Sequence, residues 1–149
     1  MSQLIEELKS DHVTLKRALK KAADFTRPAT ERVVILNEAK TALLGHLEKE
    51  NRELYPTLRA LAEHDPPLRS TLEIFARDME AIASQAMEFF GKYHDPAVVA
   101  EQFKDNVHYS IEFGKDLERL IILLGLRIGR EEKTLYPEYD RGISKTMAA

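Results

Sequence analysis

The sequence predicts an all-α fold, an antiparallel up-down-up-down four-helix bundle made of two similar helix hairpins. Strand signals are nearly absent, since no run alternates apolar and polar side chains with β-branched residues. Apolar residues instead recur every three or four positions, as on one face of a helix. Turn signals lie roughly 30 to 40 residues apart, which is the spacing of helix hairpins. Residues 1–149 are therefore expected to form a single domain that can bury a core.

Four helices are expected along the chain. The first ends before Pro28, and the second ends at the turn signal His64-Asp65-Pro66-Pro67. A kink is expected in the second helix at Pro56, because proline disturbs the preceding turn. The tail after Asp140 is expected to fray. The predicted helices cover about residues 2–25, 30–63, 68–90 and 97–139.

Composition excludes several classes of protein. A net charge of −3 gives no basic excess for nucleic-acid binding, and the absence of cysteine excludes thiolate metal sites. The N-terminus has no signal-peptide pattern, and the most apolar stretch, 120–126, is far shorter than the ~20 residues of a membrane span. Phosphate loops and Gly-x-Ser-x-Gly motifs are absent. We expect a cytoplasmic protein that is not an enzyme and binds neither nucleic acid nor membrane.

An internal repeat relates the two halves of the chain. Residues 46–56 align with residues 127–137, with a glutamate, a leucine, a tyrosine and a proline in the same places. Residues 11–15 also align with residues 78–82. Two copies of one hairpin predict a pseudo-two-fold bundle.

Two histidines and two glutamates are predicted to meet inside this bundle. His46 and Glu50 are four residues apart and so point the same way from a helix. His12 lies on the apolar stripe of the first helix, where an uncompensated polar group is costly. Glu131 lies on the matching stripe of the fourth helix. Imidazole and carboxylate groups are suitable ligands for iron, zinc or manganese, and carboxylate-bridged metal centres are built in this way.

These residues resemble the hemerythrin-like, or HHE cation-binding, domain family. The resemblance rests on Asp-His at the core of the first helix and on His-x-x-x-Glu followed by Leu-Tyr-Pro in the second. It extends from about Leu4 to Tyr139. It implies a non-haem di-iron centre used for dioxygen binding, for sensing of oxygen or nitric oxide, or for iron handling. By resemblance, His12, His46 and Glu50 would serve the first iron, and Glu131 would be the second bridging carboxylate.

Two departures argue against a complete di-iron site. The family has histidines where this chain has Met79 and Arg127. A thioether is a weak ligand for iron, and a guanidinium offers no lone pair. One iron or another divalent metal could be held by the four candidate ligands. Alternatively, Arg127 could bridge Glu50 and Glu131 without a metal, and we expect it to hydrogen bond to one or both.

Two classes of function follow from these observations. The first is an iron-binding protein with an incomplete site, with a small diatomic molecule as its ligand. The second is a metal-free homologue that serves as an interaction or signalling module. Residues 120–124 are apolar nearly all round the helix, which favours a homodimer or a protein partner for that segment.

Overall fold

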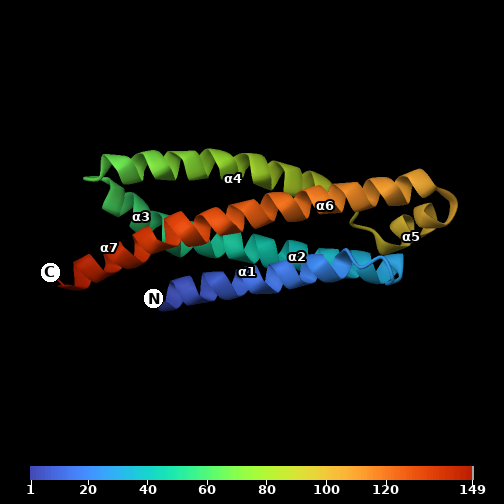
Figure 1. Ribbon diagram of the computed structural model, residues 1–149, viewed down its shortest axis with the longest axis horizontal. Helices are drawn as coiled ribbons and strands as arrows, with labels where there is room; N and C mark the ends of the chain where they lie inside the picture. The colour runs from blue at the N-terminus through green and yellow to red at the C-terminus, as the bar shows by residue number, and fades with distance from the viewer. Residues whose placement is uncertain (149) are drawn as a thin grey trace.

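The computed structural model describes the backbone of residues 1–148 and the side chains of residues 1–146, and it shows a helical bundle (Figure 1). No strand occurs in residues 1–148, so the predicted all-α class is confirmed. Two short segments are π-helical, η1 and η2. The elements are α1 (Gln3–Ala22), α2 (Ala29–Lys49), η1 (Glu50–Leu54), α3 (Tyr55–Ala62), α4 (Pro66–Lys92), α5 (Pro96–Asp105), α6 (Val107–Arg130), η2 (Glu131–Leu135) and α7 (Tyr136–Ala148).

The long helices run along one common axis (Figure 1). Helix α1 packs against α2, and α4 packs against α6. Helices α2 and α3 continue each other through η1, and α6 and α7 do so through η2. The short helix α5 lies at one end of the bundle and packs against α2 and α6. No helix among the described residues is long and apolar enough to cross a membrane.

Side chains placed before the helices define where they begin. The carboxylate of Asp65 accepts a hydrogen bond from the N–H of Leu68, and Pro66 at the first helical position needs no partner for its nitrogen. The prediction of one continuous helix over 97–139 is wrong. Asn106 is extended, with φ −144° and ψ 96°, and its side chain accepts from the N–H of Tyr109. An asparagine that caps a new helix in this way ends the previous one.

The expected fraying after Asp140 is also wrong, because α7 continues to Ala148. Two contacts hold this segment. The N–H of Ser2 donates to Asp140 at 3.1 Å. Gly142 packs so closely on Leu61 of α3 that a Cβ there would require the leucine side chain to move. The contact with α3 therefore stabilises this segment, and Tyr136, Tyr139 and Ile143 lie at the spacing of one helical face.

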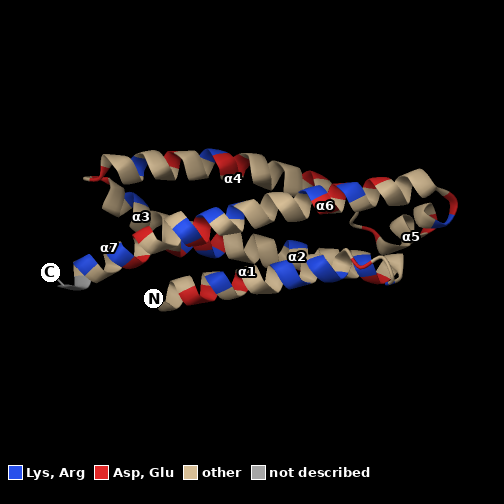
Figure 2. Cartoon of the chain, viewed as in Figure 1, with Lys and Arg blue, Asp and Glu red and all other residues tan. Residues whose placement is uncertain are grey.

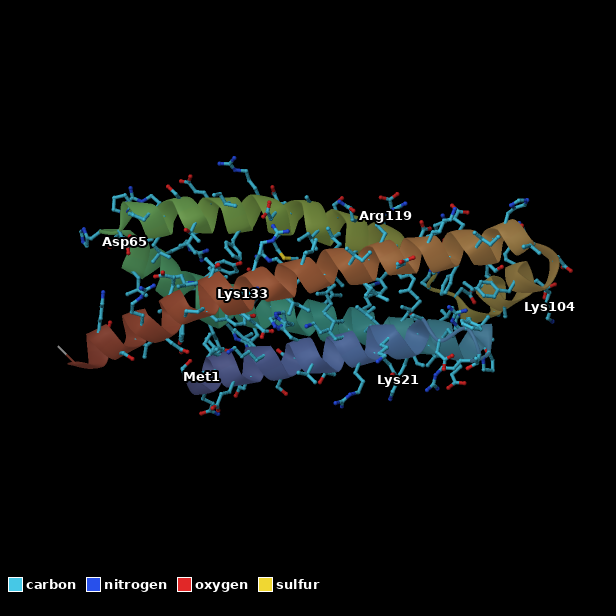
Figure 3. All side chains as sticks on the ribbon, in the orientation of Figure 1. Met1, Lys21, Asp65, Lys104, Arg119 and Lys133 are labelled. Carbon is cyan, nitrogen blue, oxygen red and sulfur yellow. The ribbon has the colours of Figure 1, made fainter. Side chains whose placement is uncertain are left out.

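The core consists of two apolar clusters with a buried polar layer between them. One cluster includes Leu15, Leu43 and Leu124, and the other includes Leu8 and Leu135. Five buried polar residues lie, along the sequence, between members of the two clusters: His12, His46, Glu50, Arg127 and Glu131. Positively and negatively charged residues are interspersed along the long helices (Figure 2). Figure 3 shows the side chains that fill the interior, with Lys133 marking the position of η2.

Candidate metal centre

Both candidate glutamates begin a π-helical segment. Glu50 is the first residue of η1 and Glu131 the first of η2, and Tyr-Pro follows each segment. Proline has no N–H to donate and its ring presses on the carbonyl four residues earlier, so the helix widens there. In each segment the tyrosine N–H instead bonds to the glutamate carbonyl five residues earlier. The kink expected at Pro56 is thus a π segment, and the internal repeat appears as the same backbone irregularity in both halves.

The four candidate ligands lie together in the polar layer. His12, His46, Glu50 and Glu131 are each at most 5% exposed. Nε2 of His12 is 3.2 Å from Nε2 of His46 and 3.5 Å from Oε1 of Glu131. Nε2 of His46 is 3.5 Å from Oε2 of Glu50. Ligand atoms of His12, His46 and Glu131 all lie within 4.8 Å of one another, so small adjustments would let them surround one ion.

Each histidine ring is oriented by a carboxylate from another helix. Nδ1 of His12 is 2.8 Å from Oε2 of Glu132, and Nδ1 of His46 is 3.0 Å from Oδ2 of Asp11. Lys49 in turn donates to Asp11 at 3.1 Å. Because a carboxylate only accepts, Nδ1 of each ring carries the proton and Nε2 faces the centre. Histidines that bind metals are held by such outer carboxylates.

The space between the two rings favours a positive charge. Burial lowers the pKa of His12, and its hydrogen bond to Glu132 offsets only part of this effect. Burial also acts to lower the pKa of His46, but its hydrogen bonds to Glu50 and Asp11 and the negative charges of Glu50 and Glu131 outweigh it and raise the pKa overall. In the metal-free chain, a proton on Nε2 of His46 would bridge the 3.2 Å to His12. A metal ion would replace that proton.

The two buried carboxyl groups differ in the direction in which their pKa values are shifted. Burial and the charge of Glu50 raise the pKa of Glu131 well above its usual value. Burial acts to raise the pKa of Glu50 too, but the hydrogen bonds and charge of His46 and the hydrogen bond from Tyr136 act against it, and the pKa is lowered to about 2. Among the described residues, Oε1 of Glu50 and Oε2 of Glu131 have no hydrogen-bond partner. Unpartnered buried oxygen atoms are costly, and a cation would satisfy both of them.

Tyr136 closes the centre from the start of α7. Its hydroxyl donates to Oε2 of Glu50 at 2.9 Å and lies 3.1 Å from Nε2 of His12. Its ring stacks on the ring of His12, with the ring centres 5.6 Å apart. Because Tyr136 is fully buried, these contacts restrict the positions of both candidate ligands.

Comparison with known families agrees with this geometry. A family model described as the hemerythrin HHE cation binding domain matches residues 3–139. The chain belongs to this family. The match runs from α1 into α7 and includes all four candidate ligands. No match was found among curated proteins or among solved structures.

Arg127, at a position that the HHE resemblance assigns to histidine, makes different contacts from those predicted. Its Nε is 3.9 Å from Oε1 of Glu131, an ion pair without a hydrogen bond, and the described residues show no hydrogen bond or ion pair between Arg127 and Glu50. The terminal nitrogens instead donate to the Phe75 carbonyl and the Tyr55 hydroxyl, both at 2.9 Å. The guanidinium also lies over the ring of Phe75, 4.6 Å from its centre. The side chain reaches past the carboxylate because these two acceptors on other helices match its planar fork.

Met79 occupies the other position that the HHE resemblance assigns to histidine. It is partly buried and packs against the larger apolar cluster. The donors that remain, two imidazole nitrogens and two carboxylates, are types that iron, zinc and manganese accept. The residues present therefore fit one metal ion, whereas a second ion would lack its nitrogen ligands.

The contributions of Asp11 and Glu132 were not predicted from the sequence, whereas Tyr136 was considered there as a residue that borders the site or only packs at a helix end. Asp11 precedes His12 and Glu132 follows Glu131. Neighbouring helical positions point in different directions, so each acidic residue reaches a histidine of another helix rather than its neighbour. The only signal in the sequence was an acidic residue adjacent to each of these candidate ligands.

Proposed function

We propose that this HHE domain binds one metal ion, with iron as the first candidate, and serves in iron handling or in sensing rather than in catalysis. The proposed ligands are His12, His46, Glu50 and Glu131. The observation that carries the proposal is the pair of Nε2 atoms, 3.2 Å apart and each opposite a carboxylate-bound Nδ1. The proposal includes the up-down-up-down antiparallel order of four long helical segments expected for a hemerythrin-like bundle.

The residues of the chain have separate tasks in this proposal. A bound iron(II) ion would supply an open coordination position for a small diatomic molecule such as dioxygen or nitric oxide. Asp11 and Glu132 keep the protons on Nδ1 of the two histidines, which leaves Nε2 free for the ion. Tyr136 donates to Glu50 and holds that carboxylate in place. The apolar clusters on either side limit water around the site.

Metal stoichiometry tests this proposal. The protein would be purified from iron-supplemented cells, stripped with a chelator and reloaded with iron(II) without oxygen, and its metal content measured by mass spectrometry. We expect one ion per chain. His46→Ala should abolish binding, whereas His64→Ala, a change at an exposed histidine in the turn before α4, should not. Two ions per chain, or none in a folded protein, would contradict the proposal.

The alternative is a metal-free module that binds another protein or a second copy of the chain. One observation favours it: Ile122 and Leu126 on α6 are more than half exposed, as expected from the apolar segment in the sequence. The same experiment separates the two functions. A folded chain that takes up no metal, and whose mass in solution depends on Ile122 and Leu126, would favour the module.

A further inference from the structure

An open pocket of about 300 Å³ lies between η1 and α4 and reaches the candidate metal centre. Leu47, Ala76, Met79 and Ala83 supply its apolar lining, and the buried Glu50 also lines it. We call this space the Met79 pocket. Its outer part includes the exposed residues Arg59 and Glu80. The HHE resemblance assigns a metal-binding histidine to the position of Met79. The pocket therefore lies where this chain lacks that ligand.

The lining of the Met79 pocket determines what it can accept. A water molecule takes up about 30 Å³ in the liquid, so the pocket can hold several molecules of that size. Apolar walls favour an uncharged molecule, and the two carboxyl groups in the lining, Glu50 and Glu80, disfavour an anion. Glu50 is both a lining residue of the pocket and a candidate ligand, so it marks where the pocket meets the centre.

Polar contacts cover the Nδ1 side of both histidine rings. Asp11, which accepts a hydrogen bond from Lys49, lies against His46, and Glu132 lies against His12. A second pocket, of about 470 Å³, shares Tyr55, Arg59 and Ala76 with the Met79 pocket and extends it between α3 and α4. The route from solvent to Glu50 therefore runs along α4.

We propose that the Met79 pocket is the access route by which a small uncharged molecule of diatomic size reaches the metal centre. The inference deepens the proposed function and rests on it for its biological role. The pocket itself is present in the metal-free chain, so its occupation can be measured without any metal.

Dissolved dioxygen is the probe, because it is paramagnetic and speeds the relaxation of nearby methyl groups in NMR spectra. The chain has only four methionines, so methyl-labelled methionine gives a simple spectrum. Met79 and Met87 are both partly buried against the same apolar cluster, but only Met79 lines the pocket. In the metal-free protein under oxygen pressure, we expect a severalfold larger effect at Met79 than at Met87. Equal effects at the two methyl groups would overturn the inference.

A matched pair of variants tests the route itself. Ala83→Phe places a ring in the pocket, whereas Ala81→Phe adds the same ring at an exposed position of α4 that does not line it. Only Ala83→Phe should remove the oxygen effect at Met79. In iron(II)-loaded protein, only Ala83→Phe should slow the reaction with nitric oxide severalfold, at unchanged iron content. An unchanged rate in iron-loaded Ala83→Phe would overturn the route, while metal analysis of the same samples reports separately on the proposed function.

Discussion

Nδ1 of His12 lies 2.8 Å from Oε2 of Glu132, the residue that directly follows the candidate ligand Glu131. The matching contact joins Nδ1 of His46 to Asp11, the residue that directly precedes His12. The sequence neighbours of two candidate ligands thus orient the histidines of other helices. The packing of α1 against α2 and η2 therefore sets the ligand positions and the ring orientations together.

Loss of an outer carboxylate should weaken metal binding. We expect Glu132→Ala to reduce the affinity about 10- to 100-fold, because His12 would lose the acceptor that holds its ring. Competition with a coloured chelator measures this affinity. Glu138→Ala is the matched control, since Glu138 pairs with the surface residue Arg141. Equal affinities of Glu132→Ala and the parent protein would show that Glu132 has no part in the site.

Removal of the buried guanidinium should destabilise the metal-free chain. Arg127→Ala leaves the Phe75 carbonyl, the Tyr55 hydroxyl and the Glu131 carboxyl without their partner, at a cost of about 3–5 kcal/mol. Arg130→Ala on the same helix breaks only a half-exposed ion pair with Asp78, which is worth at most about 1 kcal/mol. Urea denaturation followed by circular dichroism compares the two. Similar denaturation midpoints would contradict the prediction.

Two substitutions together should create a second metal position. The double variant Met79→His with Arg127→His restores the imidazoles expected from the family and removes the fixed positive charge. We expect two ions per chain in the double variant and one in each single variant. Mass spectrometry of the loaded protein gives the count. A folded double variant that still holds one ion would show that missing ligands are not what limits the site.

The ion pair between α4 and α6 should give a pH-dependent part of stability. Burial acts to raise the pKa of Asp116, but hydrogen bonds from Tyr93 and Lys92 outweigh it and lower the pKa below the usual 3.8. The ionised carboxylate therefore contributes stability above that value, and the contribution is lost as the pH falls through the lower folded pKa.

We therefore expect the difference in unfolding free energy between the parent protein and Asp116→Asn to shrink from about pH 5 to about pH 3. Urea denaturation at each pH measures this difference. In a Tyr93→Phe background the change with pH should be smaller, because the hydroxyl that donates to Asp116 at 2.6 Å is gone. A difference that stays constant over this range would contradict the assignment.

Much of the fold was predictable because helical periodicity is a local property. The three- and four-residue spacing of apolar positions predicted the helical class, and the family match over residues 3–139 agrees with the resemblance read from the sequence. The break at Asn106 was missed because asparagine can occur within a helix as well as cap one. Here it caps α6, a choice that depends on how α5 and α6 pack in the folded chain. The persistence of α7 likewise depends on its contact with Leu61.

The sequence by itself determined that His12, His46, Glu50 and Glu131 face the interior, since each lies on an apolar stripe or one turn from another candidate. Only the tertiary structure decided which polar groups meet. It directs Arg127 to Phe75 and Tyr55 instead of into a hydrogen bond with a carboxylate. The physical reason is that contacts between helices depend on their rotation and separation, which arise from packing over the whole chain and which no short stretch of sequence specifies.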